Sequence, residues 1–495
     1  MTRTDMTRRQ MLRTAGVGAL GLGLSGGIAG ELLSGALASR APRPPRAPKW
    51  RSRPDLRIPA LTVLRNEPGT SPEPVFIAPY NNPTGQAGAV IADNSGEPIW
   101  ENPLAGRVTT DFRVQSYRGA PVLTWWQGEI ELGHGVGEYV IADAAYRTIR
   151  TVQAGLGRRG DLHEFVITPR DTALLTSYRV TTADLSSVGG PRAGTIQDAM
   201  FQELDLATGD VLMEWHSLDH IPLSESYAPV GEDWDYAHIN SVDLDGDYDG
   251  DNGDGLLVSA RSTHTIYKLA QDGSILWRLG GKHSDFDMGP GTAFAWQHDA
   301  RRQPDGTITV FDNGATPAVE RLSRGLVLDV DEQAMTATLR RQYTRPPVLA
   351  GSQGSVQPLQ NGNVFVGWGE SPYVSEFDRS GRLLFDALLG SQYECYRAFR
   401  LPWTGRPAQA PALAVNHGRG GVRAYASWNG ATEVHAWRLL AGERPEQLML
   451  TPVAHARAGG FETVISSPSR GPYFAAQALD AGGTPLGSSP VARLS

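Results

Sequence analysis

The sequence contains a single cysteine, Cys395, and no long run of basic residues. One cysteine cannot form an intramolecular disulfide, so the fold must be stabilised by its core alone. Nucleic-acid binding needs clustered Lys and Arg, and the formal net charge of -8 argues against such a partner. Outside the amino terminus the sequence also lacks a long amphipathic helical pattern, which favours β structure.

The amino terminus lacks the uncharged run of roughly 20 residues that a membrane-spanning helix needs, so we expect no stable membrane anchor. Thr7-Arg8-Arg9-Gln10-Met11-Leu12 reads as a twin-arginine export signal, and it is followed by a Gly/Ala/Leu stretch and the small-residue cleavage site Ala36-Leu37-Ala38. We therefore expect residues 1–38 to be a cleaved signal peptide. The mature protein would be secreted or held in the cell envelope, and residues 39–69 would form a Pro/Arg-rich linker and lead-in.

The sequence is rich in residues that form turns, with 57 Gly and 34 Pro. Beyond residue 70 a two-part pattern recurs at intervals of roughly 50 to 65 residues. Its first part is a short β-rich run that we expect to line a centre, at residues 74–78, 122–126, 173–177, 256–260, 307–311 and 364–368. Its second part is a hairpin with a polar turn, in VIADNSGEPIW, VIADAAYRTIRTV, ELDLATGDVLMEW, KLAQDGSILWRLG, LDVDEQAMTATLRR and SEFDRSGRLLFDALL.

Six copies of this pattern predict an all-β fold, a six-bladed β-propeller over residues 70–450 with about four strands per blade. A two-sheet sandwich is the alternative. Alternating strands and turns near the carboxyl terminus predict a small immunoglobulin-like β segment over residues 451–495.

Polar residues that carry chemistry cluster beside the predicted inner strands. Three stretches share this placement: Asp161-Leu162-His163-Glu164-Phe165, Tyr236-Ala237-His238-Ile239-Asn240-Ser241-Val242 and Trp296-Gln297-His298-Asp299-Ala300-Arg301. A fourth element, Ser259-Ala260-Arg261, ends the run that follows the second stretch. Because each stretch precedes an inner run, we expect all of them on one rim of the propeller, facing a common cavity.

In order, the segments DLHEF, HINSV, SAR, TIYKL, ILWRLGGK, WQHDAR, FDNGA, QPLQNGNVFVGWG and SWNGATEV resemble the arylsulfotransferase family in its actinobacterial and fungal branch. The resemblance implies a six-bladed propeller that moves a sulfuryl group from an aryl sulfate ester to a phenol without phosphoadenosine and without a cofactor. Position by position, it implies that His298 is the sulfated nucleophile. His163, His238, Asn240 and Arg261 match the residues that the family places around the sulfate.

The chemistry of these residue types supports the same roles. A sulfuryl group spreads negative charge over three oxygens, so its transfer favours a neutral nucleophile and fixed donors around those oxygens. Neutral imidazole is such a nucleophile, and a covalent adduct implies ping-pong kinetics. Arg261, helped by the Asn240 amide, would bind the oxygens. Either His163 or His238 would protonate the leaving phenolate.

Four further residues are predicted to contact substrate with less support, namely Trp126, Trp296, Trp368 and His134 in the glycine-rich GHGVG. Arg301 is interpreted as a structural ion-pairing residue. Asp299 is expected to point away from the His298 ring, because adjacent residues of a strand face opposite sides.

The acidic run over residues 243–254 partly fits a calcium loop, but it lacks the glutamate at the twelfth position, so a solvated hairpin is favoured over bound calcium. Two other functional classes stay open. The histidines are also suited to a transition metal, which the charge of Arg261 opposes. A non-catalytic binding module is the second alternative.

Overall fold

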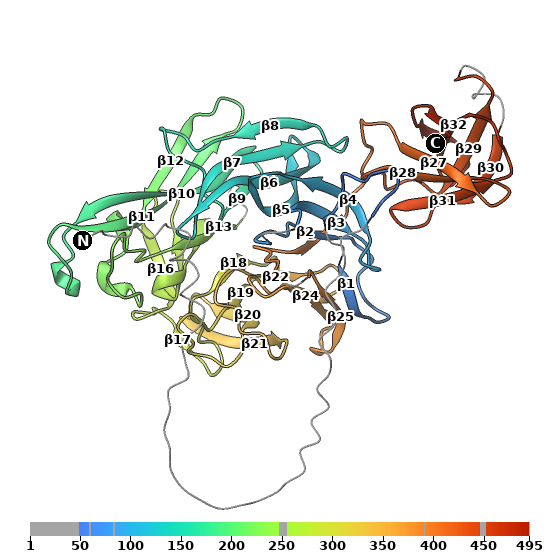
Figure 1. Ribbon diagram of the computed structural model, residues 1–495. Coiled ribbons are helices and arrows are strands. Elements are labelled where there is room, and N and C mark those ends of the chain that lie inside the picture. Colours follow the sequence, from blue (N-terminus) through green and yellow to red (C-terminus); the bar gives the residue numbers. More distant parts are fainter. Residues whose placement is uncertain are drawn as a thin grey trace, which may run out of the picture. The chain divides into compact units, whose positions relative to one another are not determined.

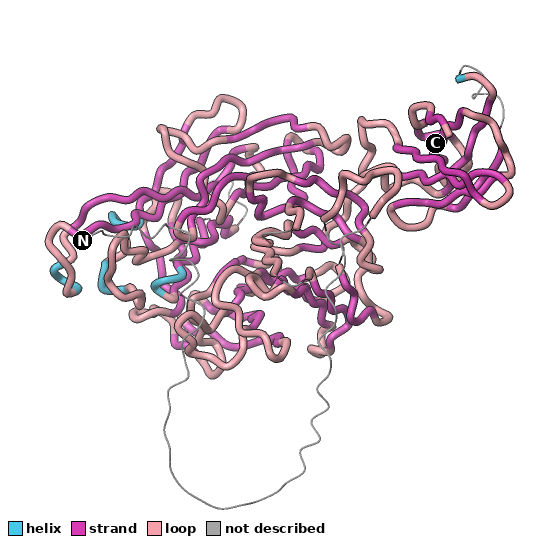
Figure 2. Tube along the Cα trace, in the orientation of Figure 1, coloured by secondary structure: helices cyan, strands magenta, loops and turns pink. Residues whose placement is uncertain are grey.

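A computed structural model describes residues 49–58, 61–82, 85–246, 255–390, 392–445 and 452–494. Strands form nearly all of its regular structure (Figure 2). The described helical turns are η1 (Ser186–Val188), α2 (Ser217–His220), η2 (Leu223–Glu225) and η3 (Arg261–Thr263). Among the described residues, none of the helices has the length and apolar character to cross a membrane. The predicted signal peptide, residues 1–38, lies outside the described residues.

Six antiparallel sheets of four or five strands make up the larger part of the described chain (Figure 1). Sheet 1 contains β26 (Phe399–Arg400), β2 (Val75–Ile77), β3 (Gly88–Ala92) and β4 (Pro98–Pro103). Sheet 2 contains β5 (Val108–Tyr117), β6 (Ala120–Glu131), β7 (His134–Ala142) and β8 (Thr148–Val152). Sheet 3 contains β9 (Phe165–Ile167), β10 (Thr172–Ala183), β11 (Gly194–Asp205) and β12 (Val211–His216).

The other three sheets follow in the same order along the chain. Sheet 4 contains β13 (Ile239–Asp245), β14 (Gly255–Ala260), β15 (Thr265–Leu269) and β16 (Ile275–Gly280). Sheet 5 contains β18 (His298–Arg302), β19 (Ile308–Asp312), β20 (Arg324–Asp331), β21 (Thr336–Thr344) and β17 (Asp287–Met288), which pairs parallel to β21. Sheet 6 contains β22 (Ser355–Pro358), β23 (Val364–Gly367), β24 (Tyr373–Phe377), β25 (Leu383–Leu388) and β1 (Thr62–Asn66).

The sheets follow one another in a closed circle. Contacts run from β2 to β5, from β5 to β9, from β10 to β13, and then through β18 and β22 to β26. Two distant segments close the circle, because β26 adds an inner strand to sheet 1 and β1 pairs with the outer strand β25 of sheet 6. A cyclic set of antiparallel sheets is a propeller arrangement, so the predicted all-β propeller class is confirmed.

The six β-rich runs that were expected to line the centre are instead the second strands of the sheets, β2, β6, β10, β14, β19 and β23. The innermost strands are β26, β5, β9, β13, β18 and β22. Second strands are covered on both faces, which explains why they are the most apolar runs, whereas innermost strands carry the polar residues of the centre. The predicted hairpins are confirmed as the third and fourth strands of each sheet.

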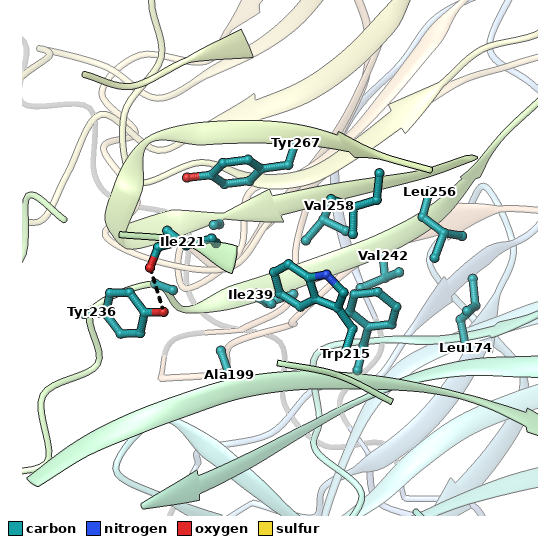
Figure 3. Close-up of a cluster of buried hydrophobic side chains, with 14 of the residues drawn as sticks. Leu174, Ala199, Trp215, Ile221, Tyr236, Ile239, Val242, Leu256, Val258 and Tyr267 are labelled. Carbon is teal, nitrogen blue, oxygen red and sulfur yellow. Dashed lines mark hydrogen bonds between the residues drawn. The ribbon is translucent and has the colours of Figure 1, made fainter. Parts of the chain in front are cut away.

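Apolar side chains hold neighbouring sheets together face to face. Between sheets 3 and 4, one buried cluster includes Leu174, Trp215, Ile239, Val258 and Tyr267 (Figure 3). In the same view the Tyr236 hydroxyl donates to the Ile221 carbonyl at 3.3 Å. Packing of this kind lets each sheet fix the position of the next one, and so fixes the innermost strands relative to one another.

The carboxyl-terminal part forms two further sheets. One contains β27 (Ala412–Gly418), β28 (Gly421–Ser427) and β31 (Glu462–Ser467). The other contains β29 (Ala436–Gly442), β30 (Pro452–Arg457), β32 (Tyr473–Leu479), β33 (Pro485–Ser488) and β34 (Ala492–Arg493). The last propeller strand ends at Arg400 and these sheets start at Ala412, which corrects the boundary expected near residue 450. The lead-in also differs from a free linker, since residues 62–66 are strand β1 and the Ser52 backbone N–H donates to Glu462 at 2.6 Å.

Candidate functional site

The three histidine-bearing stretches enter innermost strands at corresponding points. Residues 161–165 lead into β9, residues 236–242 into β13 and residues 296–301 into β18. His238 and Asp299 have left-handed backbone, with φ of 54° and 55°, and the strand register shifts next to each of them. Such irregularities re-aim side chains at the end of a strand. The prediction that these stretches occupy equivalent positions in their sheets is therefore confirmed.

Four histidine rings meet where these strands begin. The ring centroids of His163 and His238 are 4.8 Å apart, and those of His238 and His298 are 6.3 Å apart. His134, at the start of β7, lies 5.2 Å from His238. All four are buried, with exposed fractions of 9 % or less. We call His134, His163, His238 and His298 the histidine cluster.

Two members of the cluster are each held by a carboxylate. His163 Nδ1 lies 2.6 Å from Asp161 Oδ2, and His238 Nδ1 lies 2.5 Å from Asp235 Oδ2. Burial opposes the charge on both aspartates, but the neighbouring histidines still hold the pKa of each carboxyl well below its usual range. For His238, burial outweighs Asp235 and lowers the pKa to about 4. The imidazole of His238 is therefore neutral at neutral pH, with Nδ1–H donating to Asp235.

His298 has a different partner, the neutral side chain of Asn313. The Asn313 amide nitrogen donates to the carbonyls of Ala350 and Gln353, each at 3.0 Å, so its oxygen faces His298 Nδ1 at 2.7 Å as an acceptor. His298 thus carries its proton on Nδ1 and a lone pair on Nε2. Nε2 accepts the backbone N–H of Gln353 at 3.1 Å. Burial, together with the charge of Arg261, lowers the pKa of His298 well below its usual range.

Arg261 supplies positive charge beside the cluster. Its guanidinium lies 4.9 Å from the centroid of the Trp296 ring, and Nη2 donates to the Gly351 carbonyl at 3.0 Å. Its Nε is buried and has no hydrogen-bond partner among the described residues. Burial lowers the pKa of Arg261, but the guanidinium still carries its positive charge at neutral pH. A buried guanidinium with an unused donor is suited to an incoming oxyanion.

Asn240 is fully buried. Its amide nitrogen donates to the Gln297 carbonyl at 2.7 Å, whereas its amide oxygen is buried and unpartnered among the described residues. Tyr396 connects this residue to the cluster, because its hydroxyl lies 3.1 Å from the His163 carbonyl oxygen and 3.0 Å from that of Asn240. The amide N–H expected to help Arg261 is thus partly committed to the backbone of the next sheet.

His134 can lie beside the other rings because the backbone at the next residue, Gly135, comes close to residues 161–163. The Gly135 N–H donates to Asp161 Oδ1 at 2.6 Å. A Cβ atom at Gly135 would lie 2.4 Å from the Leu162 nitrogen, so only glycine allows β7 to start this close to residues 161–163. The His134 ring then packs on Tyr178, with centroids 3.9 Å apart. This placement supports the inclusion of His134 among the candidate residues.

The three tryptophans have different positions. Trp296 lies beside Arg261 and His264, with its indole N–H donating to the Pro317 carbonyl at 3.1 Å. The expectation that Trp126 and Trp368 contact substrate is corrected. Both are fully buried in apolar clusters between sheets, and their indole N–H groups are bound by the Gly160 carbonyl and by Ser375 Oγ. Packing of large second-strand side chains explains these positions.

Next to the histidines lies a group of buried charges, which we call the ionic cluster: Asp111, Glu164, Asp299, Arg113, Arg301 and Arg397. Glu164 contacts Arg113 at 2.7 Å, Arg301 at 2.6 Å and Arg397 at 3.0 Å. Although burial opposes ionisation, these guanidinium groups lower the pKa of Glu164 to about 2. The ionic cluster borders a cavity of about 400 Å³ that also contacts Gln357 and Phe399.

Two expectations are confirmed in the ionic cluster. Arg301 pairs between sheets with Glu164, as a structural residue, although it lies on an innermost strand. Asp299 faces Arg301 and Arg397, at 2.9 Å and 3.2 Å, and not the His298 ring. The acidic run 243–254 lies mostly outside the described residues. Of its described acidic members, Asp243 lies 3.4 Å from Arg301 and Asp245 pairs with Arg302 at 2.7 Å, and calcium binding stays a prediction.

Sequence reasoning gave no role to the partners of the rings. Asp161 and Asn313 stand in the quoted motifs, two before His163 and fifteen after His298, and Asp235, three before His238, directly precedes a quoted motif. The signal that the sequence offered for them was their side-chain type, since carboxylates and amides can accept a hydrogen bond from an imidazole ring. Tyr178 and Gln353 come from segments that carried no motif at all.

Residues 113–390 match the protein family described as Arylsulfotransferase (ASST), which is more than half of the chain. The chain belongs to the arylsulfotransferase family. The match contains His163, His238, His298, Asn240 and Arg261. Membership supports an aryl sulfotransferase activity and small-molecule substrates. A comparison with curated proteins gives no match.

Solved structures with some similarity to this arylsulfotransferase share little sequence with it. A protein of unknown function from Bacteroides caccae is 13% identical, with a TM-score of 0.41, over 66% of this chain and 98% of its own. A streptogramin B lyase is 9% identical, with a TM-score of 0.35, over 68% and 91%. The β-propeller domain of Cps50 (Swd1) from Myceliophteria thermophila is 13% identical, with a TM-score of 0.29, over 61% and 92%. These scores carry no argument about function.

Proposed function

We propose that this arylsulfotransferase moves a sulfuryl group from an aryl sulfate ester to a phenol through a sulfohistidine at His298. The observation that carries the proposal is the partner of the ring. His298 faces a neutral amide, Asn313, while His163 and His238 face carboxylates. Burial and the charge of Arg261 keep His298 uncharged, and Asn313 fixes its proton on Nδ1, so that Nε2 has the lone pair that a nucleophile needs.

The first half-reaction forms a nitrogen–sulfur bond. The lone pair of His298 Nε2 attacks sulfur, the bond between sulfur and the aryl oxygen breaks, and that oxygen leaves with the electron pair. The Gln353 N–H, which donates to Nε2 at 3.1 Å, must release this lone pair before the attack, and we propose that it then donates to the sulfuryl oxygens together with Arg261. Of the two candidate acids, His163 is the one proposed to give a proton to the leaving phenolate at neutral pH, because His238 is neutral there.

The second half-reaction reverses these steps with a new phenol. The histidine left neutral takes the phenol proton, the phenol oxygen attacks sulfur, and the nitrogen–sulfur bond breaks and returns its electrons to Nε2. Both candidate acids have Nδ1 against a carboxylate, so each exchanges protons through Nε2. The first product leaves before the acceptor reacts, which gives ping-pong kinetics.

Donor alone tests the proposal. Protein incubated with a nitrophenyl sulfate and no acceptor should release about one nitrophenolate per chain in a burst, and mass spectrometry should find one added sulfuryl group on the peptide that holds His298. An adduct on His238, or nitrophenolate release only when the acceptor is present, would show that the assignment is wrong.

We also propose export by the twin-arginine pathway, which the Arg8-Arg9 pair supports. Replacing both arginines by lysine should leave the precursor inside the cell. Normal secretion of the double variant would contradict this.

A further inference from the structure

Beside His298, three other side chains are arranged as a metal-binding site. His134 Nε2 lies 3.1 Å from Asp235 Oδ2, and His238 Nδ1 lies 2.5 Å from the same oxygen. One ligand atom from each of the three residues lies within 4.8 Å of the others. We infer that His134, Asp235 and His238 bind one divalent transition-metal ion of the Zn²⁺ class.

Unused polar atoms point to a missing ligand at this place. His134 is 6% exposed, and neither of its ring nitrogens makes a hydrogen bond of acceptable geometry within the described residues. Asp235 Oδ1 is also buried and has no hydrogen-bond partner there. A buried polar atom without a partner costs about 1–3 kcal/mol. A cation held by His134 and Asp235 would satisfy both side chains.

The donor set selects the class of ion. Two imidazole nitrogens and one carboxylate oxygen are typical ligands of Zn²⁺, Co²⁺ and Fe²⁺, with further positions open to water or substrate. Ca²⁺ and Mg²⁺ prefer oxygen ligands and do not fit. The carboxylates of Asp161, which is fully buried, and of Asp235, which is partly buried, balance a divalent charge. Arg261 opposes a cation, but its Nη2 donates to the Gly351 carbonyl and its guanidinium lies over the Trp296 ring.

A second set, His134, Asp161 and His163, meets the same distance criterion. Its carboxylate is already engaged. Asp161 accepts hydrogen bonds from the Gly135 N–H at 2.6 Å, from Thr176 Oγ1 at 2.9 Å and from the backbone and ring of His163. Both oxygens of Asp161 accept hydrogen bonds, whereas Asp235 Oδ1 is buried without a partner among the described residues, so the ion is assigned to the set that contains Asp235.

The inference does not rest on sulfuryl transfer. His298 is outside the metal set, and its Nε2 stays available whether or not an ion is bound. Binding of the ion to His238 Nδ1 places the ring proton on Nε2, so His238 would then act as a hydrogen-bond donor.

Full-length mature protein, treated with a chelator and desalted, is titrated with Co²⁺ and followed by visible absorption and calorimetry. We expect one Co²⁺ per chain, displacement by Zn²⁺, and a higher melting temperature with bound ion. His134→Ala and Asp235→Asn should weaken Co²⁺ binding by about tenfold or more. His163→Asn should bind as wild type does, and so should the control His417→Ala, which removes an exposed histidine of β27.

Three results would overturn the inference. These are no saturable Co²⁺ uptake by the wild type, unchanged uptake by both His134→Ala and Asp235→Asn, and loss of uptake in His163→Asn with retention in Asp235→Asn. If a variant fails to fold by circular dichroism, the wild-type titration and thermal shift still decide the case. The sulfuryl adduct on His298, measured in the same metal-free samples, tests the proposed reaction separately.

Discussion

The histidine cluster and the ionic cluster share two pairs of adjacent residues, 163–164 and 298–299, yet they differ in how completely their polar atoms are paired. In the ionic cluster each carboxylate lies within hydrogen-bond distance of a guanidinium, as Glu164 does with Arg113, Arg301 and Arg397. In the histidine cluster the rings of His163 and His238 are held by a carboxylate at Nδ1, and His134 Nδ1 has no partner within the described part of the chain. The first arrangement fixes the innermost strands, and the second leaves atoms available for a ligand.

The comparison teaches how one short motif serves two purposes. In DLHEF, His163 faces the cluster of rings and Glu164 faces the arginines. In WQHDAR, His298 meets Asn313 while Asp299 meets Arg301. Adjacent residues of an extended strand point to opposite sides, so each motif contributes one residue to chemistry and the next one to structure.

The largest contrast between the two clusters is expected from variants of two adjacent residues, His298 in the histidine cluster and Asp299 in the ionic cluster. His298→Asn should lower turnover by about 10⁴-fold or more, because the nucleophile is removed. It should leave the free energy of unfolding nearly unchanged. Asp299→Asn should do the reverse, with a loss of stability and an intact sulfuryl adduct in the folded protein. Substantial turnover by His298→Asn, measured with a nitrophenyl sulfate and phenol, would remove the distinction between the clusters.

Glu164→Gln tests the ionic cluster. Removing one partner of a buried ionic network typically costs about 3–5 kcal/mol, which urea unfolding at neutral pH would measure. The pKa of Glu164 is lowered from 4.5 to about 2, so its ionisation stabilises the fold fully above pH 4.5 and progressively less as the pH falls toward 2. The variant should lose that part of the acid sensitivity. Equal acid sensitivity in both proteins would contradict the assigned role of Glu164.

Arg261→Ala is expected to have a smaller effect on turnover than His298→Asn. Loss of one preorganised oxyanion donor typically costs roughly 3 kcal/mol, so turnover should fall by about 100-fold while the protein stays folded. Arg261→Lys is the matched control, because it keeps the charge and loses the planar donors. If Arg261→Ala turned over at the normal rate, another donor would have the oxyanion role. The Gln353 N–H, which donates to His298 Nε2, would then be the next candidate.

The repeated parts of the fold were predictable from the sequence, because periodic patterns report secondary structure directly. Hairpins such as 268–280 were read correctly as outer strands, since their alternation and turn residues recur in each sheet. The innermost strands were misplaced because strands as short as β9, which has three residues, give little signal, while the longer strands such as β10 form the clear β-rich runs. The boundary expected near residue 450 was wrong for a related reason. The strands after Ala412 have a local sequence pattern like that of the propeller strands, so the sequence does not separate the two parts.

In the site, the histidines were found and their partners were not. His163, His238 and His298 share a position in three sheets, so a repeat reveals them together. Asp235 and Asn313 lie outside the strands, and only the folded chain places them against a ring. Trp126 and Trp368 were wrong because an aromatic residue in a strand has the same sequence signature in a core as beside a ligand.

The smallest expected effect comes from changing Asn313, the hydrogen-bond partner of the proposed nucleophile His298. Asn313→Asp would place a carboxylate against His298 Nδ1, as His163 and His238 already have. An opposite charge at this distance typically raises a histidine pKa by about 1–3 units, so His298 would stay protonated to a higher pH. Protonated His298 has no lone pair on Nε2, and the acid side of the pH–rate profile for adduct formation should move upward by that amount.

The rate at neutral pH should change much less, because the pKa of His298 starts well below its usual range. Aspartate also cannot donate to the carbonyls of Ala350 and Gln353, which are bound by the Asn313 amide nitrogen. Asn313→Ala is the matched control, since it loses the same donors without adding charge. A purely structural role for Asn313 would give both variants the same slower rate, with the pH profile unmoved. An upward shift in Asn313→Asp alone would show that the neutral partner tunes the nucleophile.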